Sequence, residues 1–133
     1  MTREVDLYPA LHPERADLID GAIGAMSSFD ETFGYHADGV GPETAAMPSD
    51  WIRRASLHDI GEVTAICPAI HDRAASTAVA GRDKDADFVR TLLKERMIDI
   101  DTLLGRIVSL DAALHPVDSR VGRARRRAEE AVA

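Results

Sequence analysis

The chain has 133 residues, of which 45% are hydrophobic and 29% are charged, and its formal net charge at pH 7 is -7. We expect one domain, because a chain of this size can bury one core but not two. The acidic excess argues against general nucleic-acid binding, which depends on Lys and Arg side chains that neutralise phosphates. The single cysteine, Cys67, excludes an internal disulfide and a cysteine metal cluster, and we expect its thiol to be buried as a small apolar group.

The N-terminus lacks the apolar segment that a signal peptide carries, since charged residues begin at Arg3. The longest nearly apolar run, residues 65–70, is much shorter than the about 20 residues that a membrane-spanning helix needs. The sequence therefore predicts a cytoplasmic protein that does not insert into a membrane.

The first predicted element is a strand over residues 3–7, in which acidic and apolar residues alternate. Successive side chains of a strand point to opposite faces, so Glu4 and Asp6 share one face while Val5 and Leu7 share the other. Without further information, a pair of carboxylates in this pattern is interpreted as a solvated face of the strand.

A helix is predicted over residues 13–26, because Pro13 suits the first helical position and apolar residues follow with helical spacing. From residue 27 to residue 49 this period is lost and Gly and Pro accumulate. The pattern predicts a long ordered loop with one helical turn around Asp30 to Phe33. Loops of this length in compact domains are often functional.

Two short strands are predicted over residues 53–58 and 62–67, joined by a hairpin turn at residues 59–61. Together with the strand at residues 3–7 they would form a small sheet of about three strands. The predicted fold class is α+β, with this sheet backed by helices.

The second half of the chain is predicted to be helical. Gly81 fits the residue that ends a helix, and Asp99 fits the residue that caps the start of one. The last helix is rich in Arg, which we interpret as a solvated surface, with an RNA or phosphate contact as the alternative. The predicted helices cover residues 70–80, 84–96, 100–112 and 117–132.

Three stretches of the chain carry a resemblance to a known family. They are E-V-D-L-Y-P with H-P-E-R-A-D-L-I-D-G-A-I-G within residues 4–24, F-D-E-T-F-G-Y-H-A-D-G-V-G-P-E-T at residues 29–44, and H-D-R-A-A-S-T-A-V-A-G-R-D-K-D-A-D-F-V at residues 71–89. They resemble an uncharacterised family of nucleotidyltransferase-like proteins, similar to the toxin halves of abortive-infection toxin-antitoxin pairs. The resemblance covers roughly residues 4–110 and implies a polymerase-beta-like nucleotidyltransferase fold with a helical C-terminal part.

Nucleotidyl transfer uses metal ions that clamp the attacking and leaving oxygens, so carboxylates must converge on one face of a strand. The resemblance implies that Glu4 and Asp6 are the catalytic carboxylates and hold Mg²⁺. It also implies that Arg82 and Lys84 bind the nucleoside triphosphate by supplying positive charge. A structural interpretation stands beside this one, in which the charges at the start of the helix form exposed ion pairs and His71 and Asp72 cap a helix.

Two parts of the family pattern are missing. The Gly-Ser element that cradles the triphosphate precedes the acidic strand in the family, and the chain begins three residues before Glu4. Thr77 occupies a position where the family pattern has Lys. We therefore expect a single nucleotidyltransferase-like domain over residues 1–133 that lacks the N-terminal Gly-Ser strand-helix unit and is catalytically incomplete.

Two alternatives stay open at this point. In the first alternative, the chain is a non-catalytic assembly module that forms a homo-oligomer or binds an antitoxin-type protein. The reason is that the strand at residues 3–7 would leave an unpaired edge. In the second alternative, the chain is an N-terminally truncated reading of an active Mg²⁺-dependent nucleotidyltransferase.

Overall fold

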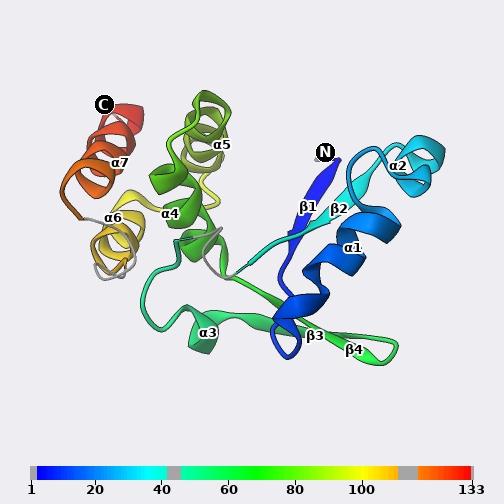
Figure 1. Ribbon diagram of the computed structural model, residues 1–133. Coiled ribbons are helices and arrows are strands. Elements are labelled where there is room, and N and C mark those ends of the chain that lie inside the picture. Colours follow the sequence, from blue (N-terminus) through cyan, green and yellow to red (C-terminus); the bar gives the residue numbers. More distant parts are fainter. Residues whose placement is uncertain (1–2, 42–45, 111–116, 133) are drawn as a thin grey trace. The chain divides into compact units, whose positions relative to one another are not determined.

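The computed structural model describes residues 3–41, 46–110 and 117–132, and its fold is α+β, as the sequence predicts (Figure 1). The chain divides into two compact units, residues 1–44 and residues 45–133, called the first and second unit below. That the two units make one nucleotidyltransferase-like domain stays a prediction. None of the helices in the described ranges has both the length and the apolar character to cross a lipid bilayer.

The first unit is built on two short parallel strands with helices between them. A parallel pair needs a crossover connection, and the helices supply it. In the pairing register Glu4 lies opposite His36 and Asp6 lies opposite Asp38. The elements in order are β1 (Glu4–Leu7), η1 (Pro13–Arg15), α1 (Ala16–Ile23), α2 (Ser28–Phe33) and β2 (His36–Gly39).

The helix predicted over residues 13–26 is shorter in the structure, since α1 ends at Ile23. The reason is local competition for the backbone. The N–H of Ala25 donates to Asp38 Oδ1 at 2.9 Å and the N–H of Met26 donates to Asp30 Oδ2 at 3.0 Å. Side chains thus take the donors that another helical turn would have used.

The prediction of a loop over residues 27–49 is wrong in part. The helical turn near Asp30 is confirmed as α2, whose start is capped by Ser27, but the same segment also contains β2. The four residues of β2 carry no bulky apolar side chain, so a pattern of strand formers does not reveal the strand. Its last residue, Gly39, lies so close to α1 that a Cβ atom there would overlap the carbonyl oxygen of Ala16.

The described residues of the second unit form a β-hairpin and five helices. The turn of the hairpin is formed by Gly61 and Glu62. Gly61 has the left-handed backbone (φ +63°) that two-residue hairpin turns require. In Figure 1 the hairpin extends away from the helices of this unit. The elements in order are α3 (Trp51–Arg54), β3 (Ser56–Ile60), β4 (Val63–Cys67), α4 (Ile70–Ala80), α5 (Asp83–Lys94), α6 (Ile100–Val108) and α7 (Val117–Val132).

The predicted sheet of three strands is wrong for the part of the chain that the structure describes. There β1 pairs with β2, and β3 pairs with β4 in antiparallel orientation, which gives two sheets of two strands. The strand predicted from residue 53 begins at Ser56, because Trp51 to Arg54 form α3. The Arg54 side chain is held by Asp72 of α4, which favours the helical turn over an early strand.

Two helices also end earlier than the sequence predicts. After α5, Arg96 takes a left-handed backbone (φ +56°), and the N–H of Met97 bonds back to the carbonyl oxygen of Leu92, which closes the helix. After α6, Leu110 forms a bridge with Pro48 instead of a further turn. Residues 111 and 112 of the prediction lie outside the described residues.

The core of the second unit lies among its helices, with the side chains of Leu103 and Ile107 fully buried. Cys67, expected to be buried, is exposed. The reason is that β4 belongs to a two-stranded hairpin, in which residues such as Val63 and Ile66 are exposed as well. The hydrophobic core of the second unit is formed by the buried residues Ala46, Ala74, Ala75, Val79, Val89, Leu92, Ile98, Leu103, Ile107, Leu110, Ala124 and Ala128.

Candidate metal-binding site

Three carboxylates meet on one face of the β1–β2 pair. Glu4 and Asp6 share a face of β1 because they are two residues apart, and the register puts Asp38 of β2 opposite Asp6. Each offers one oxygen, and these three oxygens all lie within 4.8 Å of one another. We call Glu4, Asp6 and Asp38 the carboxylate cluster. The prediction from sequence found its first two members and missed the third, although the alternation His36-Ala37-Asp38 was a signal for it.

The carboxylate of Asp38 is oriented by the first unit itself. Its Oδ1 accepts the hydrogen bond from the N–H of Ala25, and its Oδ2 lies 3.6 Å from His36 Nε2. The other ring nitrogen of His36 lies 3.3 Å from Asp30 Oδ1. His36 thus lies between Asp30 and Asp38 and restricts the orientation of the Asp38 carboxylate.

Asp30 holds the turn that follows α1. The hydrogen bond from the N–H of Met26 is the main cause that lowers the pKa of Asp30 below its ordinary value. Burial opposes this effect, and the hydrogen bond and charge of His36 add to it. Asp30 therefore stays ionised at neutral pH and anchors both the turn and the histidine.

The cluster suits a hard divalent cation. All three donors are carboxylate oxygens, the ligands that Mg²⁺ and Ca²⁺ prefer. Glu4 and Asp6 are exposed and Asp38 is half-buried, so an ion could reach them from solvent.

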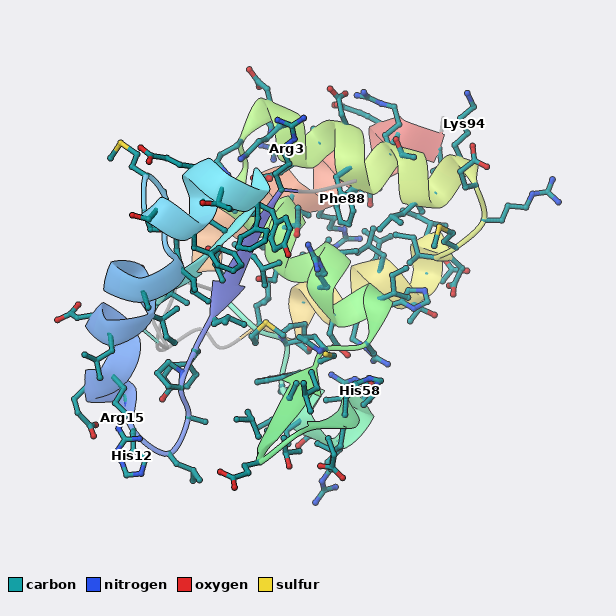
Figure 2. The ribbon with its side chains drawn as sticks, turned by 90° about the vertical axis from the view of Figure 1, so that its right-hand side faces the viewer. Arg3, His12, Arg15, His58, Phe88 and Lys94 are labelled. Atoms are coloured by element: carbon teal, nitrogen blue, oxygen red, sulfur yellow. The ribbon has the colours of Figure 1, made fainter. Side chains whose placement is uncertain are left out.

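The sequence of the first unit has Arg3 and Arg15 as its only Lys or Arg residues. Figure 2 shows Arg3 at the start of β1, with Arg15 and His12 at the far end of this unit.

The residues predicted to bind the nucleotide, Arg82 and Lys84, lie at the start of α5 in the second unit. Arg82 is already engaged: its Nε donates to Asp85 Oδ2 at 2.7 Å, and its own N–H donates to the same carboxylate at 3.3 Å. The interpretation of this segment as an ion pair at a helix start is therefore confirmed for Arg82 and Asp85. Lys84 is exposed, and Thr77 lies half-buried on α4. A shared role of these residues with Glu4 and Asp6 stays a prediction.

A second ionic group, which sequence reasoning missed, surrounds Asp72 of α4. Asp72 is fully buried, and Arg54 of α3 donates to both of its oxygens, from Nε at 2.9 Å and from Nη2 at 2.7 Å. The Nε of Arg106 from α6 lies 3.5 Å from Asp72 Oδ1. We call Arg54, Asp72 and Arg106 the arginine–aspartate cluster. The hydrogen bonds that Arg54 donates to Asp72 raise the pKa of Arg54, so its guanidinium stays charged.

The predicted role of His71 and Asp72 as a helix cap is wrong. Asp72 pairs with the two arginines, and His71 Nε2 lies 3.1 Å from Asp99 Oδ2. Asp99 is the cap of α6, and its Oδ1 accepts a hydrogen bond from the N–H of Thr102 at 2.8 Å. Its bonds with Thr102, and then the charge of His71, hold the pKa of Asp99 below its ordinary value against the effect of burial.

Comparison with known proteins adds no relative to this picture. No family model, curated protein or solved structure matches the chain. The resemblance to nucleotidyltransferases therefore stays a prediction from the three sequence stretches.

Proposed function

We propose that the chain is a nucleotidyltransferase-like protein whose first unit binds Mg²⁺ through the carboxylate cluster. The observation that carries this proposal is the parallel register of β1 and β2. It adds Asp38 to the two carboxylates that the resemblance implies as metal ligands.

The three residues have distinct parts in holding the ion. Glu4 and Asp6 would hold the ion from β1, and Asp38 would hold it from β2. The N–H of Ala25 donates to Oδ1 of Asp38 and His36 Nε2 lies 3.6 Å from Oδ2, so a cation would share the Asp38 carboxylate with these two partners. When bound, Mg²⁺ would supply the charge that stabilises a triphosphate during phosphoryl transfer.

We expect the chain by itself to bind the metal ion without transferring a nucleotide. A triphosphate needs cationic or backbone N–H groups around it. In the first unit only two arginines are available, and Thr77 replaces the family's Lys in the second. Arg82, one of the two predicted nucleotide-binding cations, is bound to Asp85.

The direct test of the metal site is calorimetric titration of the chain with Mg²⁺ and with Mn²⁺. We expect one saturable site, and binding about tenfold weaker or more in Asp6→Asn and Asp38→Asn, because each variant removes a charged ligand. The matched control is Asp17→Asn, which removes an exposed carboxylate of α1 outside the cluster. Unchanged affinity in both cluster variants, or an equal loss in the control, would rule out the site.

A second assay tests the absence of transfer. The chain is incubated with Mg²⁺ and each labelled nucleoside triphosphate, with RNA and protein acceptors. We expect no labelling of RNA or of the chain itself. Strong labelling that disappears in Asp6→Asn would show an active transferase and contradict the incomplete site.

A second candidate function, assembly with another protein molecule, is favoured by the hairpin of the second unit. Leu57, Ile60 and Val63 of β3 and β4 are each at least 65% exposed. An isolated two-stranded hairpin is marginally stable in water, so contact with a partner would stabilise it. We expect a homo-oligomer in light scattering at micromolar concentration, and a strictly monomeric profile at every concentration would count against this function.

A further inference from the structure

The arginine–aspartate cluster holds more positive than negative charge. Arg54 donates to both oxygens of the buried Asp72, so each oxygen already accepts one hydrogen bond from the same guanidinium. The Nε of Arg106 lies 3.5 Å from Asp72 Oδ1, is buried, and forms no hydrogen bond within the part of the chain that the structure describes. Two cations thus share one anion, and a further anion would have to be bound by the solvent-accessible parts of the two guanidinium groups, because the Arg106 Nε is buried.

Other acidic groups do not correct this imbalance by direct contact. Within the described ranges, neither Arg54 nor Arg106 forms an ion pair with any carboxylate other than Asp72. Asp50 acts on Arg54 only at longer range, as the weakest of the causes that raise the pKa of Arg54. A charge that is partly buried without a counter-ion is costly, so a site of this kind favours an anion from solvent.

The two guanidinium groups are positioned to share such an anion. Both approach Asp72 Oδ1, so they are neighbours, although they come from different helices, α3 and α6. Their side chains are 27% and 31% exposed, which leaves part of each group accessible to solvent. Asp72 fixes the orientation of Arg54, and a fixed guanidinium fork matches the oxygens of a phosphate.

We propose that Arg54 and Arg106 form a binding site for a phosphate group where α3, α4 and α6 meet. Asp72 does not touch the ligand; it positions Arg54. This site lies within the second unit and does not depend on the metal site of the first unit. The net charge of -7 on the chain opposes any anion, so binding here requires these specific donors.

The test follows the arginine Nε–H signals in ¹H–¹⁵N spectra of the full chain during titration with inorganic phosphate at constant ionic strength. Arg106→Lys and Arg54→Lys identify the two signals, because Lys has no Nε–H group. We expect saturable shifts of both signals, and affinity about tenfold weaker in Arg106→Gln, the loss expected for one charge-assisted hydrogen bond. The matched control is Arg125→Gln, which removes an exposed arginine paired with Glu129 and should leave binding unchanged.

The proposal is overturned if these two signals shift no more than those of exposed arginines such as Arg90, or if Arg106→Gln binds phosphate as the control does. If Arg106→Gln does not fold, the wild-type spectra alone decide between the two outcomes. A parallel titration with a nucleoside monophosphate without metal identifies the source of the phosphate group. Tighter binding than inorganic phosphate points to a nucleotide, and equal binding points to the free ion.

Discussion

Different interactions stabilise the first unit and the second unit. In the first unit, no residue of η1, α1 or α2 is buried, and side chains such as Asp20, Asp30 and Asp38 tie the segments together by accepting backbone N–H bonds. In the second unit, helices pack around Leu103 and Ile107, and an aspartate is fully buried among arginines. Aspartate thus accepts backbone hydrogen bonds as an exposed or half-buried residue in the first unit, and it is a buried ion-pair partner in the second.

This difference predicts where each unit is vulnerable. Exposed hydrogen bonds contribute little net free energy each, so the first unit is expected to open locally more easily and to gain stability from a bound ion. The second unit loses most when a buried group is removed, because the removal leaves a cavity or takes away the partner of a charged group. The four predictions below test this contrast, from the largest expected change in unfolding free energy to the smallest.

Asp72→Ala is expected to cause the largest loss. Removing the carboxylate leaves Arg54 and Arg106 without their common partner, and breaking a buried pair in this way costs about 3–5 kcal/mol. Urea denaturation followed by circular dichroism measures the effect. The control is Asp87→Ala, which breaks an exposed pair with Arg90 and should cost at most about 1 kcal/mol. Equal losses in the two variants would mean that the buried pair has no special role.

Leu103→Ala is expected to cost about 2–5 kcal/mol, because it removes a fully buried side chain and leaves a cavity. Leu18→Ala in α1 is the matched change in the first unit. Leu18 is 68% exposed, so the loss should stay within about 0.5 kcal/mol. The same denaturation experiment compares the two variants. A comparable loss for Leu18→Ala would show that the first unit also depends on apolar burial.

Gly39→Ala is expected to disturb the first unit alone, at a cost of about 1–3 kcal/mol, because the new methyl group would overlap the carbonyl of Ala16. Hydrogen exchange of the β1–β2 amides measures this local loss. Gly21→Ala in α1 meets no atom within 4 Å and should stabilise the helix by up to about 1 kcal/mol. Unchanged exchange at β1 and β2 in Gly39→Ala would mean that α1 can move away from β2 freely.

The smallest effect is a pH dependence at the start of α6. The pKa of Asp99 is lowered in the folded state, so its contribution to stability is fully present above the ordinary aspartate value of about 3.9 and is lost as the pH falls through the lower folded value. Denaturation midpoints measured between pH 6 and pH 2.5 test this. Asp99→Asn should lose less stability over that window than the wild-type chain, whereas Asp101→Asn should follow the wild-type curve. An Asp99→Asn curve parallel to that of the wild type would contradict the assignment.

Local patterns predicted much of the fold. The sequence predicts α4 at its observed bounds because Gly81 marks its end, and it predicts the start of α6 because Asp99 caps that helix. Both signals lie within a few residues of the feature that they specify. The extended strand β2 was missed because its residues carry no such local signal, and its pairing with β1 decides its conformation.

The site residues also fall into those that a local sequence rule predicts and those that depend on contacts between distant segments. Glu4 and Asp6 could be paired from sequence because alternation along one strand is a local rule. Asp38 joins them only through the register of a parallel pair, and Arg54 meets Asp72 from a segment 18 residues away. Burial is equally non-local, which is why Cys67 was expected inside and lies outside: its exposure depends on what covers the hairpin.

The exposed thiol of Cys67 also has a practical consequence. Because the sequence contains no other cysteine, a maleimide or a spin label would attach at a single known position on β4. Oxidation could join this sulfur only to another molecule, so a covalent dimer formed without reductant would be linked through the hairpin. Purification with and without reductant would then distinguish chemical cross-linking from true self-association, and a spin label at β4 would report directly on whatever approaches that strand.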